Sequence, residues 1–251
     1  MGNQKMANHD PGVEFQGERR QAIDEMSQDQ ELKRKSLDWM LHADKYKYSY
    51  NFTWLGRPII KLPQDIIALQ EVIWATKPDL IIETGIAHGG SIIFSASMLE
   101  LIGKGDVVAV DIDIRQHNRV LIEAHPMFKR ITMIEGSSVD PAVVSQVRQY
   151  AKDKEHVMVI LDSSHTHDHV LQELYAYSSL VTTDCHLILP DTFIEYFPKG
   201  YYANRPWDVG NNPMTALKEF LQNNNNFVVD HEINDKLMIT EAFDGYLKRI
   251  K

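Results

Sequence analysis

The sequence predicts an α/β protein built on one doubly wound, mostly parallel sheet, preceded by a helical cap and ending in an antiparallel hairpin. From Pro78 onward, short β-branched runs alternate with amphipathic stretches, as expected when crossover helices join parallel strands. The last two β-rich runs are separated only by Asn234 and Asp235, and so short a link requires antiparallel strands. Upstream of the sheet, apolar residues recur at helical spacing among many charged residues.

The N-terminal part of the sequence predicts a tail followed by a cap. Residues 1–18 are polar, contain Gly and Pro and show no periodicity, so we expect a disordered tail. Residues 19–58 form the expected cap, with one or two amphipathic helices over 21–42 and then an aromatic stretch that ends at Gly56 and Pro58. This stretch packs the cap on the main domain or on another subunit, or it forms a wall of a substrate pocket. The sequence leaves these readings open.

Residues 59–251 are expected to form the main domain. The predicted strands are β-branched, apolar runs: Asp79–Thr84, Asp106–Asp113, Ile131–Gly136, Val157–Asp162, His186–Asp191, Phe227–Ile233 and Lys236–Thr240. The predicted helices are stretches that can present one apolar face: Ser91–Ile102, Gln116–His125, Ala142–Lys152, Val170–Leu180 and Pro213–Asn223. No internal repeat interrupts this alternation, so we expect one large domain with appendages.

Composition limits the classes of function. A chain of 251 residues that is 43% hydrophobic can bury the core of one large domain. The net charge of -9 argues against a nucleic-acid partner, because a phosphate backbone would be repelled on average. The single cysteine, Cys185, excludes an internal disulfide. No apolar run approaches the roughly 20 residues of a membrane helix, and no signal peptide is evident, so we expect a cytoplasmic location.

A glycine-rich loop follows the first predicted strand and opens a helix. The segment runs from Glu83 to Ser91 and contains Gly85, His88, Gly89 and Gly90. Glycines let the backbone approach a ligand closely, and a helix N-terminus offers free N–H donors. The spacing is not that of the dinucleotide-binding motif. With an acid directly before it, the loop suits the amino and carboxylate groups of S-adenosylmethionine better than a pyrophosphate.

The second and third strands end in residues that can bind the rest of such a cofactor. Asp111 lies 28 residues beyond Glu83 and can accept hydrogen bonds from both ribose hydroxyls, with Asp113 as the alternative. Ser137 and Ser138 can meet the adenine, although small polar residues are also common helix caps.

Two acids end neighbouring strands further along the chain. Asp162 and Asp191 would lie at the sheet edge where open α/β folds bind ligands, and together they can share a hard cation such as Mg²⁺. Thr192 or waters would complete the oxygen ligands. We also expect Asp162 to border the cofactor. The alternative for Asp162 is a capping role at the next helix.

His165 lies three residues beyond Asp162, close enough to reach a metal-held substrate hydroxyl. An imidazole with an ordinary pKa of about 6.5 is a suitable proton acceptor near neutral pH. A long loop after the second acid contains Arg205, Trp207, Asn211 and Asn212, and it either covers a substrate or is an irregular surface connection.

The segments IIETGIAHGGS, VVAVDID, ILDSSHTH, LPDT and RPWDVGNNPMTAL together resemble the cephalosporin hydroxylase family, over about 52–251. The layout is also similar to macrocin-type sugar O-methyltransferases and, more distantly, to catechol O-methyltransferase. The resemblance implies a class I methyltransferase (Rossmann-like) fold, Mg²⁺ on Asp162 and Asp191, and His165 as the base. Several relatives have an acid directly before the second metal aspartate, where this sequence has Pro190.

We therefore expect a metal-dependent enzyme that transfers a methyl group from S-adenosylmethionine to a hydroxyl of a small molecule, such as a sugar, a glycoside or a natural product. We also expect a homo-oligomer. Two alternatives remain: an iron-dependent hydroxylase and a cofactor-binding partner that has lost catalysis. The iron triad normally uses two His and one carboxylate, the reverse of the ratio at these strand ends.

Overall fold

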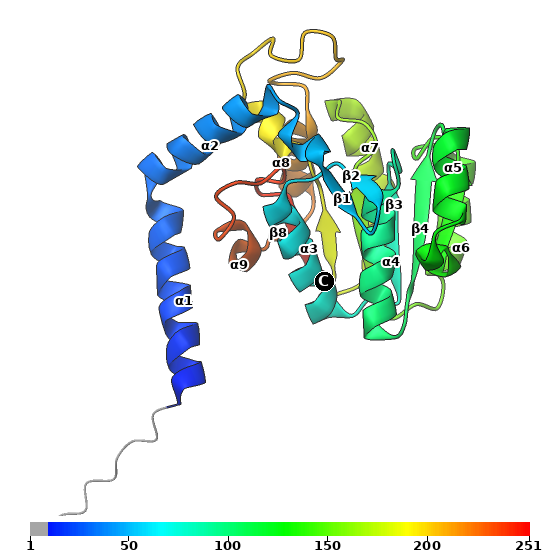
Figure 1. Ribbon diagram of the computed structural model, residues 1–251, viewed down its shortest axis with the longest axis horizontal. Helices are drawn as coiled ribbons and strands as arrows, with labels where there is room; N and C mark the ends of the chain where they lie inside the picture. Colours follow the sequence, from blue (N-terminus) through cyan, green and yellow to red (C-terminus); the bar gives the residue numbers. More distant parts are fainter. Residues whose placement is uncertain (1–9) are drawn as a thin grey trace, which may run out of the picture.

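A seven-stranded sheet forms the centre of the structure, a computed structural model that describes residues 10–251 (Figure 1). The strand order is β5-β4-β3-β6-β7-β9-β8. The bounds are β3 Leu80–Thr84, β4 Asp106–Asp111, β5 Ile131–Glu135, β6 Val157–Leu161, β7 His186–Ile188, β8 Phe227–Val229 and β9 Tyr246–Arg249. The first five of these strands are parallel, and β9 runs antiparallel to both β7 and β8. The predicted mostly parallel sheet with a C-terminal antiparallel pair is confirmed.

The sheet has a switch point between β3 and β6. From β3 the chain adds β4 and β5 on one side, and it then crosses to β6 and β7 on the other side. Both β3 and β6 are buried along their whole length, as the continuous apolar runs predict. Ligands of open α/β sheets bind outside the carboxyl ends of the strands at such a point, so the predicted site residues are carried to one place.

Helices cover both faces of the sheet. In Figure 1, α3 and α4 lie in front of the strands, and α7 packs with α8 behind them. The bounds are α1 Pro11–Gln28, α2 Gln30–Asp44, α3 Pro63–Thr76, α4 Gly90–Ile102, α5 Gln116–Glu123, α6 Pro141–Ala151, α7 His167–Tyr177, α8 Pro213–Asn223 and α9 His231–Asn234. Short 3₁₀ helices are η1 Tyr48–Asn51, η2 Pro126–Arg130, η3 Ser178–Leu180 and η4 Thr192–Tyr196. Along the described part of the chain, no helix is long and apolar enough to cross a membrane.

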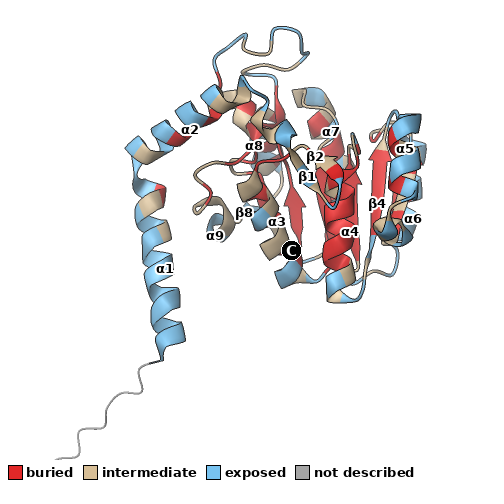
Figure 2. Ribbon diagram, viewed as in Figure 1, coloured by how far each residue is buried: buried red, intermediate tan, exposed pale blue. Residues whose placement is uncertain are grey.

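The N-terminal cap consists of α1, α2, η1 and the two-stranded sheet of β1 Phe52–Trp54 and β2 Arg57–Ile59. Asp29 follows the last residue of α1 and caps the start of α2. Its side chain accepts a hydrogen bond from the Leu32 N–H at 2.9 Å. Helix α1 extends away from the sheet, and Figure 2 shows that it is mostly exposed. The predicted disordered tail is wrong for residues 11–18, which belong to α1, and residues 1–9 lie outside the described residues.

Three further differences separate the structure from the sequence prediction. Helix α3 was not predicted, since its apolar residues lie on most of its faces and show little amphipathic pattern. Strand β7 ends at Ile188, three residues before the predicted end at Asp191. The second hairpin strand, expected at Lys236–Thr240, is wrong: β9 pairs with β8 instead, and residues 230–245 form the connection. Asn234 stabilises this connection, because its side-chain oxygen accepts the Asp244 N–H at 2.8 Å.

Candidate active site

A cavity of about 970 Å³ opens over the carboxyl ends of β3, β4, β6 and β7. One wall of it, here called the sheet wall, comes from the loops that follow these strands. The opposite wall, here called the cap wall, comes from α2, η1 and residues 193–207. Because the two walls face the same space, a ligand at the sheet edge lies within reach of the cap.

The glycine-rich loop forms the part of the sheet wall that follows β3. Gly85 has a φ of +92°, and a Cβ there would lie 2.0 Å from the Asp162 carbonyl oxygen. A Cβ on Gly90 would lie 2.1 Å from the Pro58 carbonyl oxygen. Only glycine fits these two close approaches. Gly85, His88, Gly90 and Ser91 line the cavity as predicted, whereas Gly89 supplies the turn (φ +84°) that opens α4.

Glu83 lies at the bottom of this loop and is fully buried. The Ser91 hydroxyl of the same loop acts to lower the pKa of Glu83, but neither carboxylate oxygen makes a hydrogen bond of ordinary length and angle. Burial raises the pKa of Glu83 to about 7, although the nearby charge of Lys61 acts in the opposite direction. A buried carboxylate without a donor is costly, so this group fits a cationic or N–H-bearing ligand.

Asp111 at the end of β4 holds the glycine-rich loop in shape. One of its oxygens accepts the Ile86 N–H at 2.7 Å and the Ala87 N–H at 3.3 Å, and the other accepts the Asp113 N–H at 3.0 Å. A carboxylate offers about four acceptor positions, so capacity for a further donor remains. Asp113 also lines the cavity, but its exposed carboxylate faces Arg115 at 3.8 Å.

The sequence did not reveal two polar residues that support the loop from behind. Arg57 of β2 is buried and donates to the His88 carbonyl oxygen, with Nε at 3.0 Å. Asn118 of α5 accepts from Arg57 at 3.1 Å and donates to the Ala87 carbonyl oxygen at 2.9 Å. These contacts join residues far apart in the sequence, so no local pattern indicates them.

The predicted adenine contacts, Ser137 and Ser138, are not part of the cavity lining. Ser138 is buried, and its hydroxyl lies 3.1 Å from His169 Nε2 and 3.4 Å from the Ser163 hydroxyl. Its carbonyl oxygen accepts from Tyr177 at 2.7 Å. The structure therefore gives Ser138 a role in packing α7 against the sheet.

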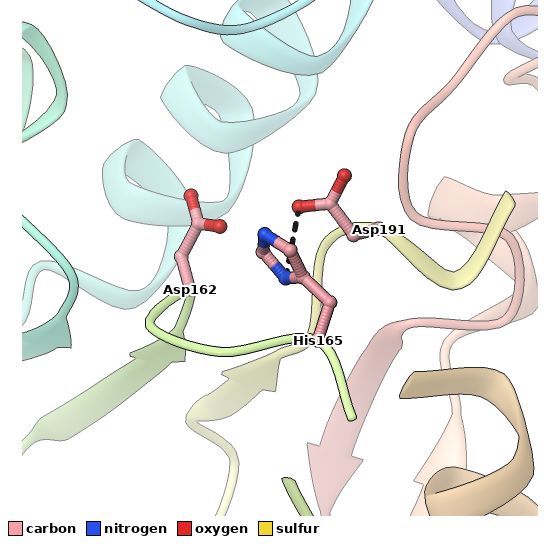
Figure 3. Close-up of side chains that lie close together, drawn as sticks. All are labelled: Asp162, His165 and Asp191. Carbon is pink, nitrogen blue, oxygen red and sulfur yellow. Dashed lines mark ion pairs between the residues drawn. The ribbon is translucent and has the colours of Figure 1, made fainter. Parts of the chain in front are cut away.

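Asp162, His165 and Asp191 come together at the ends of β6 and β7 (Figure 3). Each offers one ligand atom, and these atoms all lie within 4.8 Å of one another. His165 Nδ1 lies 3.5 Å from Asp191 Oδ2. Asp191 has a left-handed backbone with φ of +59°, unusual for a residue other than glycine. We call these three residues the Asp–His–Asp cluster.

The electrostatics of this cluster favour a bound cation and a neutral imidazole. Burial and the neighbouring Asp162 raise the pKa of Asp191 well above its ordinary value, because two close carboxylates repel each other. Burial lowers the pKa of His165 below 6.5, although the charge of Asp162 acts in the opposite direction. A neutral His165 has a lone pair that can accept a proton.

Thr192, expected as a third metal ligand, is turned away from the cluster. It is fully buried, and its hydroxyl donates to the Glu241 carbonyl oxygen at 3.4 Å. Thr192 does not line the cavity. Its predicted role as a metal ligand is therefore not supported, since the left-handed turn at Asp191 directs the next side chain into the core.

Aromatic side chains dominate the cap wall, so the cap does form a wall of the cavity. They are Trp39, Tyr48, Tyr50, Phe193, Phe197, Tyr201, Tyr202 and Trp207. The Trp207 and His165 rings pack edge to face, with their centroids 4.6 Å apart. The Arg205 guanidinium carbon lies 5.2 Å from the centroid of the Trp207 ring. Arg205 and Trp207 therefore lie where the sequence predicts a substrate wall.

Asn211 and Asn212, also predicted to contact substrate, anchor the loop instead. The Asn211 side chain accepts the His167 N–H at 2.9 Å and donates to the Pro206 carbonyl oxygen at 2.9 Å. Asn212 is fully buried and forms a capping box with Thr215 at the start of α8. The Asn-Pro-x-Thr pattern of this cap was visible in the sequence and indicates a helix start.

Comparisons with known proteins agree with this architecture. Two curated rhamnosyl O-methyltransferases are similar. The one from Mycobacterium bovis (strain BCG / Pasteur 1173P2) is 28% identical over 205 residues, 78% of each chain. The one from Mycobacterium leprae (strain TN) is 30% identical over 148 residues, which cover 58% of this chain and 62% of the relative.

Among solved structures, a CmcI structure with Mg and SAM aligns with a TM-score of 0.57 and 18% identity, covering 80% of this chain and 78% of the other. An O-methyltransferase from Bacillus cereus in complex with SAH aligns with a TM-score of 0.52 and 14% identity, covering 86% and 91%. At these identities the likeness shows the fold, and the predicted class I methyltransferase fold is confirmed. Residues 46–250 match the family described as Rhamnosyl O-methyltransferase/CmcI, and the chain belongs to that family.

Proposed function

We propose that this enzyme transfers the methyl group of S-adenosylmethionine to a hydroxyl of a small molecule, with a divalent cation such as Mg²⁺ bound by Asp162 and Asp191 of the Asp–His–Asp cluster. The observation that carries the proposal is the shared cavity: the glycine-rich loop and the cluster open into one space. At about 970 Å³ this space lies near the top of the usual range for ligand pockets, about 300–1,000 Å³, which suits a cofactor together with an acceptor.

The residues of the sheet wall fit the cofactor. Glu83 has two buried oxygens without donors, which match the ammonium group of the methionine part. Asp111 can accept a ribose hydroxyl with its remaining acceptor capacity. The bound cofactor would supply the electrophilic methyl group. Because the loop and the cluster line one cavity, an acceptor hydroxyl held at the cluster would share that cavity with the methyl group.

The cluster fits a hard divalent cation. Asp162 and Asp191 offer carboxylate oxygens, and the repulsion that raises the pKa of Asp191 would be offset by a positive charge between them. Such a cation would lower the pKa of an acceptor hydroxyl. His165 then accepts the hydroxyl proton on its imidazole, and its lowered pKa keeps that nitrogen free at neutral pH.

The acceptor is proposed to be a sugar, a glycoside or a related natural product. The cap wall presents flat aromatic faces, and the relatives named above are rhamnosyl O-methyltransferases. An iron-dependent hydroxylase fits less well, because the cluster holds two carboxylates and one imidazole, whereas the iron triad normally holds the reverse. A catalytically inactive partner would not require the cluster at all.

Calorimetry tests the proposal directly. S-adenosylmethionine should bind with a stoichiometry of about one per chain, and Mg²⁺ should bind to the same protein. A screen of glycoside acceptors with methyl-labelled cofactor should then give product that chelator abolishes and Mg²⁺ restores. Failure to bind S-adenosylmethionine would contradict the proposal, and full turnover by demonstrably metal-free enzyme would remove the cation from it.

A further inference from the structure

A buried lysine, Lys61, contacts the Asp162 carboxylate of the Asp–His–Asp cluster. Lys61 lies between β2 and α3 and is only 3% exposed. Its ammonium group donates to Asp162 Oδ2 at 3.1 Å and to Glu241 Oε1 at 3.0 Å. A buried ammonium is costly unless it is paired, so these two contacts hold it firmly.

The position of Lys61 is fixed by a network from three distant segments. Asp65 of α3 is buried and accepts the Glu241 N–H at 2.8 Å, which orients the Glu241 side chain. Asp65 also accepts from the Thr240 hydroxyl at 2.5 Å and from the Tyr246 hydroxyl at 3.2 Å. The contact with Glu241 is buried and the contact with Asp162 is partly buried, so the ammonium group cannot leave Asp162 without giving up a paired position in the core.

This arrangement determines what Asp162 can offer to a metal. Carboxylates bind hard cations through one oxygen or through both. The Lys61 ion pair takes one acceptor position on Oδ2 and holds a positive charge against that oxygen, so Oδ1 is the better placed of the two to bind a cation. It also places a fixed positive charge next to the proposed cation site, where like charges repel.

We propose that Lys61 is an internal competitor for Asp162 that disfavours metal binding through Oδ2 and keeps divalent-cation affinity low. The inference rests on the proposed function, because it assumes that the cluster binds a divalent cation. Glu241 moderates the competition, since it shares the ammonium group with Asp162. With less carboxylate charge donated to it, the cation would acidify an acceptor hydroxyl more strongly.

The test is Mn²⁺ affinity, measured by calorimetry and by the EPR signal of free Mn²⁺. Lys61→Met should bind Mn²⁺ about tenfold more tightly or better, because it removes the competing charge and frees Oδ2. The matched control is Lys104→Met, which removes the same charge from a surface pair with Asp79, at the opposite end of β3. The control should bind Mn²⁺ like the wild type. Equal or weaker binding by Lys61→Met overturns the proposal.

Glu241→Gln provides a second, milder test in case Lys61→Met does not fold. With the charge of Glu241 removed, the ammonium group interacts more strongly with Asp162, so Mn²⁺ binding should weaken several-fold. Where Lys61→Met does fold, the same change should have a smaller effect in that background. An effect in that background as large as in the wild type would identify Glu241 as a direct ligand and overturn the proposal, as would unchanged Mn²⁺ binding by Glu241→Gln alone.

Measurements on the wild type distinguish failure of the proposed metal site from failure of the proposed role of Lys61. If wild-type protein takes up no Mn²⁺, the proposed metal site fails and the role of Lys61 fails with it. If it binds Mn²⁺ and Lys61→Met matches it, only the role of Lys61 is overturned. Thermal unfolding accompanies each titration, so that a loss of folding is not read as a loss of metal affinity.

Discussion

The sheet wall and the cap wall enclose the same cavity but are built differently. The sheet wall consists of strand ends tied to one another: the Gly85 N–H donates to the Val110 carbonyl oxygen at 2.8 Å, and the Asp162 N–H donates to the Thr84 carbonyl oxygen at 2.9 Å. The cap wall consists of aromatic rings from helical and irregular segments that touch edge to face, and its Tyr50 is 51% exposed.

This difference indicates a division of labour. Strand ends in a hydrogen-bonded sheet hold side chains to a defined geometry, which proton transfer and metal binding require. Exposed rings such as those of Trp39 and Tyr50 can adapt to different acceptors at little cost. Substitutions in the sheet wall should therefore affect turnover or cofactor binding, and those in the cap wall should affect the acceptor.

The largest effect should come from Asp162→Asn in the sheet wall. The change preserves the shape of the side chain but removes the charge, so the cluster is left with one carboxylate. We expect loss of metal-dependent methyl transfer to background, together with weaker Mn²⁺ binding in the same titration used above. Wild-type turnover by this variant would separate the cluster from the chemistry.

His165→Ala should have the next largest effect. Loss of a positioned base slows proton transfer by roughly 10²–10⁴-fold, and neither Asp162 nor Asp191 depends on this ring for its place at a strand end. Single-turnover rates with saturating cofactor measure the step, and calorimetry should show cofactor and Mn²⁺ still bound. An undiminished rate would mean that another group removes the proton.

Asp111→Ala should weaken cofactor binding by about 1–3 kcal/mol, the range for leaving a hydrogen-bonded donor unpaired. Its carboxylate holds the Ile86 and Asp113 N–H groups and borders the cavity. The matched control is Asp113→Ala, because that exposed carboxylate makes only a long contact with Arg115. If the control loses as much affinity as Asp111→Ala, the ribose contact belongs to Asp113.

The affinity for S-adenosylmethionine should depend on pH through Glu83. Burial raises the pKa of this carboxyl to about 7, so the charged form is present above that value and is lost as the pH falls through it. Below about pH 7, affinity should fall by up to roughly tenfold per pH unit. Glu83→Gln should bind weakly at every pH from 6 to 8, and a pH dependence retained by that variant would point to another group.

The smallest effect should come from the cap wall. Trp207→Ala removes the ring beside His165 and should raise the KM for the acceptor by about tenfold or less, in line with the 0.5–1.5 kcal/mol of a ring contact. Affinity for S-adenosylmethionine should stay the same. Trp74→Ala on α3, outside the cavity, is the control. A large loss of cofactor affinity in Trp207→Ala would erase the proposed difference between the walls.

The sequence predicted the parts of this molecule that depend on local pattern and sheet topology. Asp162 and Asp191 were found because parallel strands end at one edge, and acids there are conspicuous after apolar runs. The hairpin was misplaced because Lys236–Thr240 contains a short apolar run typical of a strand, whereas two of the four residues of β9 are charged. The position of β9 is set by its pairing with β7 and β8, and no local sequence pattern predicts that pairing.

Residues that act through distant contacts were missed for a related reason. Lys61 and Glu241 are 180 residues apart, and neither belongs to a motif. Conversely, Asn211 and Asn212 were predicted to bind substrate because amides on a loop after a strand end can do so. Backbone groups at two helix starts use these side chains instead: Asn212 caps α8, and Asn211 accepts the His167 N–H at the start of α7. The expected homo-oligomer stays a prediction.

The closed base of the 196–211 loop has a consequence for how such enzymes diversify. Glu195 accepts from Asn212 Nδ2 at 2.6 Å and from the Gly210 N–H at 2.9 Å, which joins the two ends of the loop. Since these bonds close the loop at its base, insertions at its exposed tip, residues 203–206, need not disturb α8 or the strand ends. Doubling a loop's length costs only about 0.6 kcal/mol. Exchange of this tip is thus a route by which recombination, natural or in the laboratory, could change the acceptor while the catalytic residues stay the same.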